Sequence, residues 1–408
     1  MSITAMQNAL IAGNRQEYGR HYDSLEFLMP GQATAAYAAR DELLVWLREN
    51  AEFGCSDTKV DCRRLSPGCQ SCAAGVWSCL FVNGRCNATC FYCPTSQDAT
   101  EDPVTNGISF TNPADYAEYV ALFGFTGVSI SGGEPLLTLD RTLAYLDAVR
   151  RRCGTAVHLW MYTNGTLLTT DIAGELRAAG LDEIRFDIGA TNYDLTKLHL
   201  ATDVIPRVTV EIPAVPEEEA LLREKLVEMA ASGVRHLNLH QMRLTPHNFR
   251  HLAGRAYTFV HGEKVMVLES ELSALRLIRY AIEKRIDLPV NYCSFPYKRR
   301  FQHAAARRRG IPFVQDAQET VTAAGYLRAL SAGGVQYFEA VIQPAASSNK
   351  SAVEIPLPSG QRLMVWKRPV SPLLPVDTAL FADLSLQSYL PDELLLLERI
   401  PAGLADYF

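Results

Sequence analysis

The chain has 408 residues, of which 48% are hydrophobic and 21% charged, so it can bury a large core and long disordered segments are not expected. That length suits one large domain with a smaller appendage. The formal net charge of −6 argues against nucleic acid as the main partner, because phosphate neutralisation needs clustered lysine and arginine. We find no amino-terminal export signal and no apolar run of about 18 residues, and therefore expect a cytoplasmic protein without a membrane span.

Residues 1–77 are expected to form an extension that is helical over 1–54, with an amphipathic pattern over 33–50, and then irregular and rich in cysteine. The chain has ten cysteines, and eight of them lie between Cys55 and Cys93. In a secreted protein such a cluster would indicate disulfides. Without an export signal it favours metal binding.

A strand–helix alternation begins at residue 78. The expected strands are short and mostly rich in β-branched or aromatic residues: 79–82, 127–131, 156–162, 183–188, 208–212 and 235–240. Helical patterns cover 113–123, 142–152, 171–179 and 217–232. Strands that alternate with crossover helices form a parallel sheet, so we predict an α/β fold in which residues 78–295 form a partial (β/α)6 barrel of the TIM type, with its chemistry at the carboxyl ends of the strands.

A further helix is expected over 270–284 and a further strand over 288–293. Residues 296–408 are predicted to be a small appendage with strand alternation over 336–368 and a turn near 358–360. Segment 298–309 is rich in arginine, which could shape a pocket for a phosphate or carboxylate or form a solvated helical face.

Three cysteines with unusual spacing, Cys86, Cys90 and Cys93, follow the first expected strand. Three thiolates can bind three irons of a 4Fe–4S cubane and leave the fourth iron open. An open iron can chelate the amino and carboxylate groups of S-adenosylmethionine (SAM), and the reduced cluster can then break a C–S bond. The alternatives are a zinc knuckle, whose usual spacing differs, or three unrelated core thiols.

Gly132, Gly133 and Glu134 follow the second expected strand. Two glycines would let a ligand approach the backbone, and a carboxylate could accept a hydrogen bond from the methionyl ammonium of SAM. Alone, the pair of glycines would indicate an ordinary turn. Its position at the next strand end favours a site shared with the cysteines.

The two motifs resemble those of the radical SAM superfamily over roughly residues 80–241. Within this resemblance Tyr92 matches the aromatic residue beside the adenine, and Gly132, Gly133 and Glu134 match the methionine-binding motif. The chain also resembles uncharacterised proteins related to pyruvate formate-lyase activating enzymes, in segments 68–75, 179–186, 210–213 and 291–298. The resemblance implies a 4Fe–4S cluster, SAM and an electron donor such as flavodoxin or ferredoxin.

Polar residues end several other strands. Asn164 would form either a turn or part of the site. Arg185 and Asp187 lie two apart on one strand and share a face, so Asp187 could bind the SAM ribose and Arg185 a carboxylate, or the two could form a structural ion pair. Glu211 and His240 are weaker candidates.

A second metal site is expected from the remaining cysteines. Cys69 and Cys72 have a chelating spacing, and Cys293 could return to the barrel mouth. The expected ligands of an auxiliary 4Fe–4S cluster are these three, completed by Cys62, Cys55 or Cys79. Zinc is the leading alternative and unligated thiols are the third.

These observations favour a radical SAM enzyme that abstracts hydrogen from a substrate, with a small metabolite preferred. One alternative is an activase or modifying enzyme that acts on a protein or peptide partner. The other is a non-enzymatic iron–sulfur or zinc scaffold protein.

Overall fold

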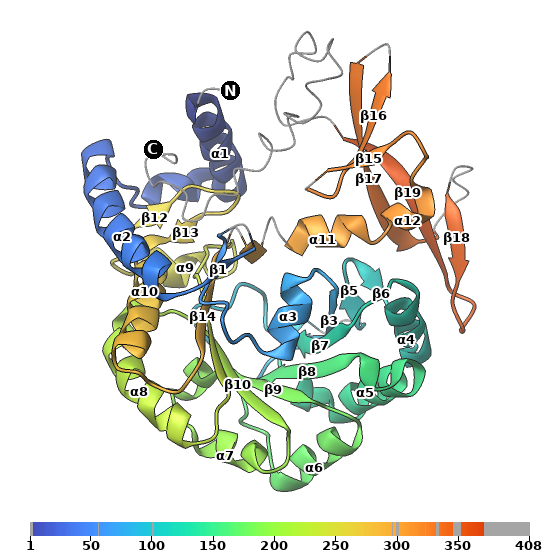
Figure 1. Cartoon of the computed structure of the whole chain (residues 1–408), viewed down its shortest axis with the longest axis horizontal. Coiled ribbons are helices and arrows are strands. Elements are labelled where there is room, and N and C mark those ends of the chain that lie inside the picture. The colour runs from blue at the N-terminus through green and yellow to red at the C-terminus, as the bar shows by residue number, and fades with distance from the viewer. Residues whose placement is uncertain are drawn as a thin grey trace.

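The computed structural model describes residues 3–55, 57–99, 102–295, 297–298, 302–322, 324–331, 334–345 and 352–370. Its centre is a curved sheet with helices along its outer face, a second small sheet from the carboxyl-terminal part, and two long helices from the amino-terminal part (Figure 1). The predicted α/β fold is therefore confirmed.

Parallel strands form the central part of the curved sheet. In the described residues they are β3 (Trp77–Arg85), β7 (Gly127–Gly132), β8 (His158–Thr163), β9 (Glu183–Phe186), β10 (Arg207–Pro213), β11 (His236–His240) and β14 (Val290–Cys293). Each pairs in parallel with the next in this order. All six strands predicted for the barrel are present. The further strand expected over 288–293 joins them as β14, so the parallel run is one strand longer than the predicted (β/α)6 unit.

Crossover helices cover the outer face of this sheet. They are α4 (Pro113–Leu122), α5 (Leu139–Cys153), α6 (Thr170–Ala178), α7 (Thr196–Thr202), α8 (Glu219–Ala231) and α10 (Leu268–Glu283). Alternate strand residues such as Ile130, Met161 and Val210 are fully buried in the core cluster that joins sheet and helices. The period of two along each strand thus directs aliphatic side chains outward to the helices. The sequence did not predict α7, whose seven residues are too few for a clear helical period.

The sheet stays open between its two edges instead of closing into a barrel. Beyond β14 come β2 (Lys59–Val60) and β1 (Phe53–Gly54), and beyond β3 come β5 (Val104–Thr105) and β6 (Ile108–Ser109), all antiparallel. Residues 1–77 therefore contribute strands to the barrel sheet as well as forming an extension. The helix α3 (Pro67–Ala73) lies inside the curve (Figure 1), in contact with β3, β7 and β8.

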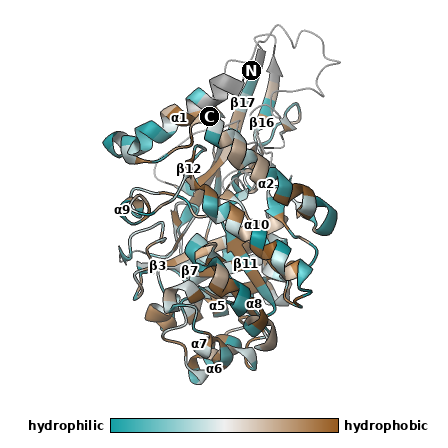
Figure 2. Cartoon of the chain, turned by 90° about the vertical axis from the view of Figure 1, so that its left-hand side faces the viewer, coloured by the Kyte–Doolittle hydropathy of each residue, from teal (hydrophilic) through white to brown (hydrophobic). Residues whose placement is uncertain are grey.

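The amino-terminal helices are α1 (Ile3–Tyr18) and α2 (Pro30–Asn50), joined by a 3-10 turn (Gly19–Ser24). The helix α2 packs on α10, where Arg40 and Glu271 form a buried ion pair at 2.8 Å. A short helix α9 (Phe249–Leu252) and the hairpin of β12 (Phe259–Val260) and β13 (Met266–Val267) lie between β11 and α10. Polar and apolar residues alternate along the helices (Figure 2), and none in the described ranges is long and apolar enough to cross a membrane.

The predicted β appendage is present as an antiparallel sheet. It comprises β15 (Thr320–Val321), β16 (Leu327–Ser331), β17 (Gly334–Pro344), β18 (Val353–Pro356) and β19 (Arg362–Val370). The turn expected near 358–360 contains Gly360 with φ +91°, and Ser359 donates its main-chain N–H to Asp115 of α4 at 2.8 Å. The appendage is thus tied to the barrel helices.

The arginine-rich segment does not form a wholly solvated face. It contains α11 (Gln302–Arg308), followed by α12 (Ile311–Val314), while Arg299 and Arg300 lie outside the described residues. Arg309 donates to the carbonyls of Gly75 and Trp77 at 3.1 and 2.8 Å, and Arg307 donates to the carbonyl of Ala324. These two arginines hold chain segments together. They therefore match neither the expected anion pocket nor the expected solvated helical face.

Candidate active site

The loop with the three cysteines begins directly after β3, at the carboxyl end of the sheet. Its conformation is held by hydrogen bonds from Cys86 N to the carbonyl of Gln97 and from Cys93 N to the carbonyl of Cys90, each at 3.0 Å. Cys86, Cys90 and Cys93 are free, partly exposed thiols. The loop therefore presents three sulfur atoms at the end of the barrel where chemistry is expected.

The donor set fits an iron–sulfur cluster. Two N–H groups, from Ala88 N and Asn164 Nδ2, point at Cys86 Sγ at 3.5 and 3.8 Å, and such hydrogen bonds tune cluster thiolates. Burial raises the pKa of Cys90 to about 12, so this thiol needs a metal cation to lose its proton at neutral pH.

In the part of the chain that the structure describes, no three His, Cys, Asp or Glu side chains are placed to hold a metal ion. A single ion requires its ligands to converge on one point, whereas a cubane presents its irons at separate corners. The cubane predicted for this loop and the zinc ion considered as its alternative both stay predictions.

Gly132 and Gly133 are required by the close approach of β7 to β3. A Cβ atom would lie 2.1 Å from the carbonyl oxygen of Asn83 at Gly132, and 1.9 Å from that of Arg85 at Gly133. Gly132 also has φ +132°. One side of each glycine therefore faces the main chain of β3, and the expected contact of these glycines with a ligand stays a prediction. The glycines bring the second motif against the cysteine loop.

Glu134 joins the ends of β7 and β8. Its carboxylate accepts hydrogen bonds from Leu136 N at 3.0 Å, Thr163 Oγ1 at 2.8 Å and Asn164 N at 2.7 Å. The side chain is buried, and burial raises its pKa although the hydrogen bonds oppose this. Glu134 therefore fixes the loops around the site, while its expected contact with a SAM ammonium stays a prediction.

Asn164 belongs both to a turn and to the site. Its Oδ1 accepts from Thr166 N at 3.0 Å, as in a turn, and its Nδ2 donates to Asn87 Oδ1 at 2.8 Å and faces Cys86 Sγ. The two alternatives weighed from the sequence thus coexist in one side chain.

Tyr92 and Asp187 form a second link across the mouth of the barrel. The Tyr92 hydroxyl donates to Asp187 Oδ1 at 2.8 Å, and Gly189 N donates to the same oxygen at 3.1 Å. Burial raises the pKa of Asp187 to about 6, against the effect of these hydrogen bonds. Asn248 holds the Tyr92 carbonyl from the other side at 3.2 Å.

Arg185 lies inside the barrel in a buried network of ion pairs. It pairs with Glu183 at 2.8 Å and with Glu211 at 2.7 Å, donates to Ser66 Oγ at 3.1 Å, and lies over the Trp160 ring. Its side chain is 3% exposed. The structure thus favours the ion pair considered from the sequence, although the partners are Glu183 and Glu211, not Asp187.

Glu211 and His240 also face the interior. Burial acts to raise the pKa of Glu211, but the charge of Arg185 and the weaker effects of neighbouring groups together outweigh it, and the pKa falls to about 2. Burial lowers the pKa of His240 to about 3, so this imidazole is neutral at pH 7. Asn238 donates to Glu211 at 3.0 Å and extends the polar network toward β14.

The cysteines assigned to an auxiliary cluster separate into groups. Cys69 and Cys72 on α3 and Cys293 at the end of β14 lie around Lys59. Cys55 and Cys62 lie in the β1–β2 segment, and Cys79 faces Ser129 and Ser131 on β7.

Sequence reasoning did not identify several polar residues of the barrel interior. Glu183, Asn238 and Asn291 alternate with aliphatic residues on their strands, a period-two signal that could have identified them. No local signal identifies Lys59, because its partners come from a strand more than 200 residues away.

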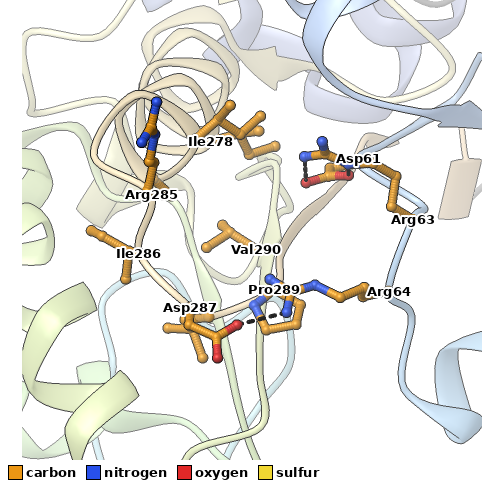
Figure 3. A pocket seen from close by; sticks show the side chains of 12 residues that line it. Asp61, Arg63, Arg64, Ile278, Arg285, Ile286, Asp287, Pro289 and Val290 are labelled. Carbon is orange, nitrogen blue, oxygen red and sulfur yellow. Dashed lines mark hydrogen bonds and ion pairs between the residues drawn. The ribbon is translucent and has the colours of Figure 1, made fainter.

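A pocket of about 380 Å³ lies near the start of β14, whereas Cys293 lies at the other end of this strand (Figure 3). Its charged residues are largely paired with one another, Arg64 with Asp287 at 2.7 Å and Arg63 with Asp61 at 2.6 Å. We therefore assign it no part in the site.

Residues 80–211 match the family model of the radical SAM superfamily. The chain is 30% identical over 242 residues to a protein of Methanocaldococcus jannaschii named as a candidate glycyl-radical enzyme activating enzyme, covering 56% of this chain and 63% of that protein. It is 28% identical over 159 residues to a GTP 3',8-cyclase of Campylobacter jejuni, covering 39% and 47%. The crystal structure of Streptococcus suis SuiB aligns with a TM-score of 0.40 and 11% identity over 58% of this chain and 56% of that one. The chain thus spans less than two thirds of each of these proteins.

Proposed function

Because the chain belongs to the radical SAM enzyme superfamily through residues 80–211, we propose that it cleaves SAM reductively and uses the resulting radical to abstract hydrogen from a substrate. The observation that carries this proposal is the loop of Cys86, Cys90 and Cys93 at the carboxyl end of β3, held against the Gly132–Glu134 segment at the end of β7. A 4Fe–4S cluster on these cysteines would supply the electron that breaks a C–S bond and yields a 5′-deoxyadenosyl radical.

The surrounding residues position the reactants. The Tyr92–Asp187 hydrogen bond joins the loops that follow β3 and β9. The two side chains provide an aromatic face and a carboxylate for the adenosine of SAM. Glu134 and Asn164 hold the β7 and β8 loops against Cys86. Keeping these groups fixed and buried excludes water from a reactive radical. Reduction requires an external donor, for which we propose flavodoxin or ferredoxin.

SAM cleavage is tested directly. The protein is reconstituted without oxygen, reduced with dithionite and given SAM, and 5′-deoxyadenosine is measured by chromatography. We expect the product from wild type and from Cys153→Ala, whose thiol lies outside the site at the end of α5. The triple variant Cys86→Ala, Cys90→Ala and Cys93→Ala should form none. A fully iron-loaded wild type that forms no product would refute the proposal.

A second candidate function specifies the substrate. The name of the Methanocaldococcus jannaschii relative favours a glycine of a partner protein as the hydrogen donor, over the small metabolite preferred from the sequence. Incubation with SAM, reductant and a glycyl-radical enzyme from the same genome would then generate a protein glycyl radical, visible by electron paramagnetic resonance. Consumption of a small metabolite with no protein radical would favour the metabolite instead.

A further inference from the structure

Three thiols from distant segments meet around one buried lysine in the open side of the barrel. Cys69 and Cys72 are three apart on α3 and therefore lie on the same side of that helix. Cys293 ends β14, and Lys59 is its direct partner on the antiparallel strand β2. This cluster is separate from the Cys86–Cys93 loop.

Strong hydrogen-bond donors point at the sulfur atoms of this group. Lys59 Nζ lies 2.7 Å from Cys293 Sγ, while the Tyr297 hydroxyl and Gln302 Nε2 lie 2.9 and 3.0 Å from Cys72 Sγ. A neutral thiol is a weak acceptor, and a buried donor without a good acceptor destabilises the fold. The arrangement suits sulfur atoms that carry negative charge.

The charge of Lys59 supports the same conclusion. The side chain is 1% exposed, and its described hydrogen bonds are to Asn291 Oδ1 and Cys293 Sγ, neither of which is a carboxylate. A buried ammonium group needs an anion close by. The sulfur of Cys293, if it carries negative charge, is the group in contact with Lys59 that can serve as this anion.

We propose that Cys69, Cys72 and Cys293 bind a second 4Fe–4S cluster. Thiolates select zinc or iron–sulfur clusters among biological metals. Three thiolates from two separate elements can occupy three corners of a cubane, with zinc as the alternative metal. Lys59, Tyr297 and Gln302 donate hydrogen bonds to the ligand sulfurs and offset the charge of the buried cluster.

The geometry narrows the ligand set expected from the sequence. Cys79 faces Ser129 and Ser131 on β7, so it is not a ligand. Cys55 and Cys62 lie beside Lys59 and Cys293, with Cys62 Sγ 3.7 Å from the Lys59 carbonyl, so either of them can complete the set of Cys69, Cys72 and Cys293.

The test measures metal in a chain that cannot hold the first cluster. The full chain with Cys86→Ala, Cys90→Ala and Cys93→Ala is reconstituted without oxygen with iron and sulfide. We expect it to retain about four irons and four sulfides. Adding Cys69→Ala and Cys72→Ala should remove them, while adding Cys79→Ala, a matched cysteine inside the same barrel, should not. The readout is independent of SAM cleavage, so its outcome does not depend on the proposed function.

Three results would overturn the proposal: an iron-free triple variant, bound zinc in place of iron, or iron that persists without Cys69 and Cys72. Circular dichroism checks that each variant is folded. Tyr297→Phe provides a second measurement in a folded protein. It should keep the iron and lower the reduction potential of the remaining cluster, because one hydrogen bond to its sulfur is lost. An unchanged potential would contradict the assigned contact.

Discussion

The hydroxyl group of Tyr92 donates a hydrogen bond to Oδ1 of Asp187 at 2.8 Å and so joins the cysteine loop after β3 to the end of β9. This bond crosses the mouth of the barrel between elements about a hundred residues apart. We expect SAM to bind beside this hydrogen bond.

Replacing Tyr92 with Phe should weaken SAM binding about fivefold to tenfold, because one buried hydrogen bond contributes about 1 kcal/mol and the loop loses its tie to β9. Anaerobic calorimetry on the reconstituted protein measures the Kd. Tyr37→Phe, on the exposed side of α2, is the control. Equal affinities for the Tyr92 variant and wild type would show that this bond does not organise the site.

Glu134→Gln should destabilise the protein by about 2–3 kcal/mol. The carboxylate accepts from Leu136 N, Thr163 Oγ1 and Asn164 N, and an amide turns a donor toward some of them. Urea unfolding measures the difference. The control Glu118→Gln breaks a surface pair with Arg152 and should cost less than about 1 kcal/mol. Similar losses in both variants would contradict the assigned role of Glu134.

Gly133→Ala should cost at least about 2 kcal/mol, because the new Cβ would lie 1.9 Å from the Arg85 carbonyl and force β3 and β7 apart. Gly174→Ala is the matched control on the exposed side of α6, where nothing lies within 4 Å. It should stabilise the helix by about 0.5–1 kcal/mol. Thermal unfolding of both variants distinguishes them, and a harmless Gly133→Ala would refute the packing argument.

Glu211 should contribute to acid unfolding. Its pKa in the folded protein is lowered from 4.5 to about 2, since Arg185, the largest lowering cause, and neighbouring groups together outweigh burial. The unfolded chain therefore binds a proton before the folded chain does, so the stabilisation is complete above pH 4.5 and is lost as the pH falls through 2. Its size is about 3 kcal/mol, from 1.36 kcal/mol for each unit of pKa.

Urea unfolding of the apo-protein from pH 7 to pH 2 tests this expectation. Glu211→Gln should be less stable at pH 7 and should lose less stability on acidification than wild type. Glu228→Gln, in a surface pair with Lys225, should follow the wild-type curve. If the Glu211 variant kept the wild-type slope between pH 4.5 and 2, the ion pair with Arg185 would not be the cause.

Local features were predictable because they depend on short-range spacing. The period of two along 127–131 and 208–212, and the helical patterns between such segments, indicated the parallel sheet. The spacing of Cys86, Cys90 and Cys93 indicated the cysteine loop. The short helix α3 was missed because its seven residues, with Pro67 and Gly68 among them, resemble an irregular segment.

The sequence by itself determined the alternation of strands and helices and located the Cys86–Cys93 loop after the first parallel strand, because hydrophobic period and residue spacing act over a few residues. The tertiary structure alone decided that Arg185 is held by Glu183 and Glu211, and that the two glycines of β7 meet the main chain of β3. It also placed Lys59 beside Cys293, 234 residues away. Such contacts depend on how the sheet curves and leaves one side open, which no local pattern encodes.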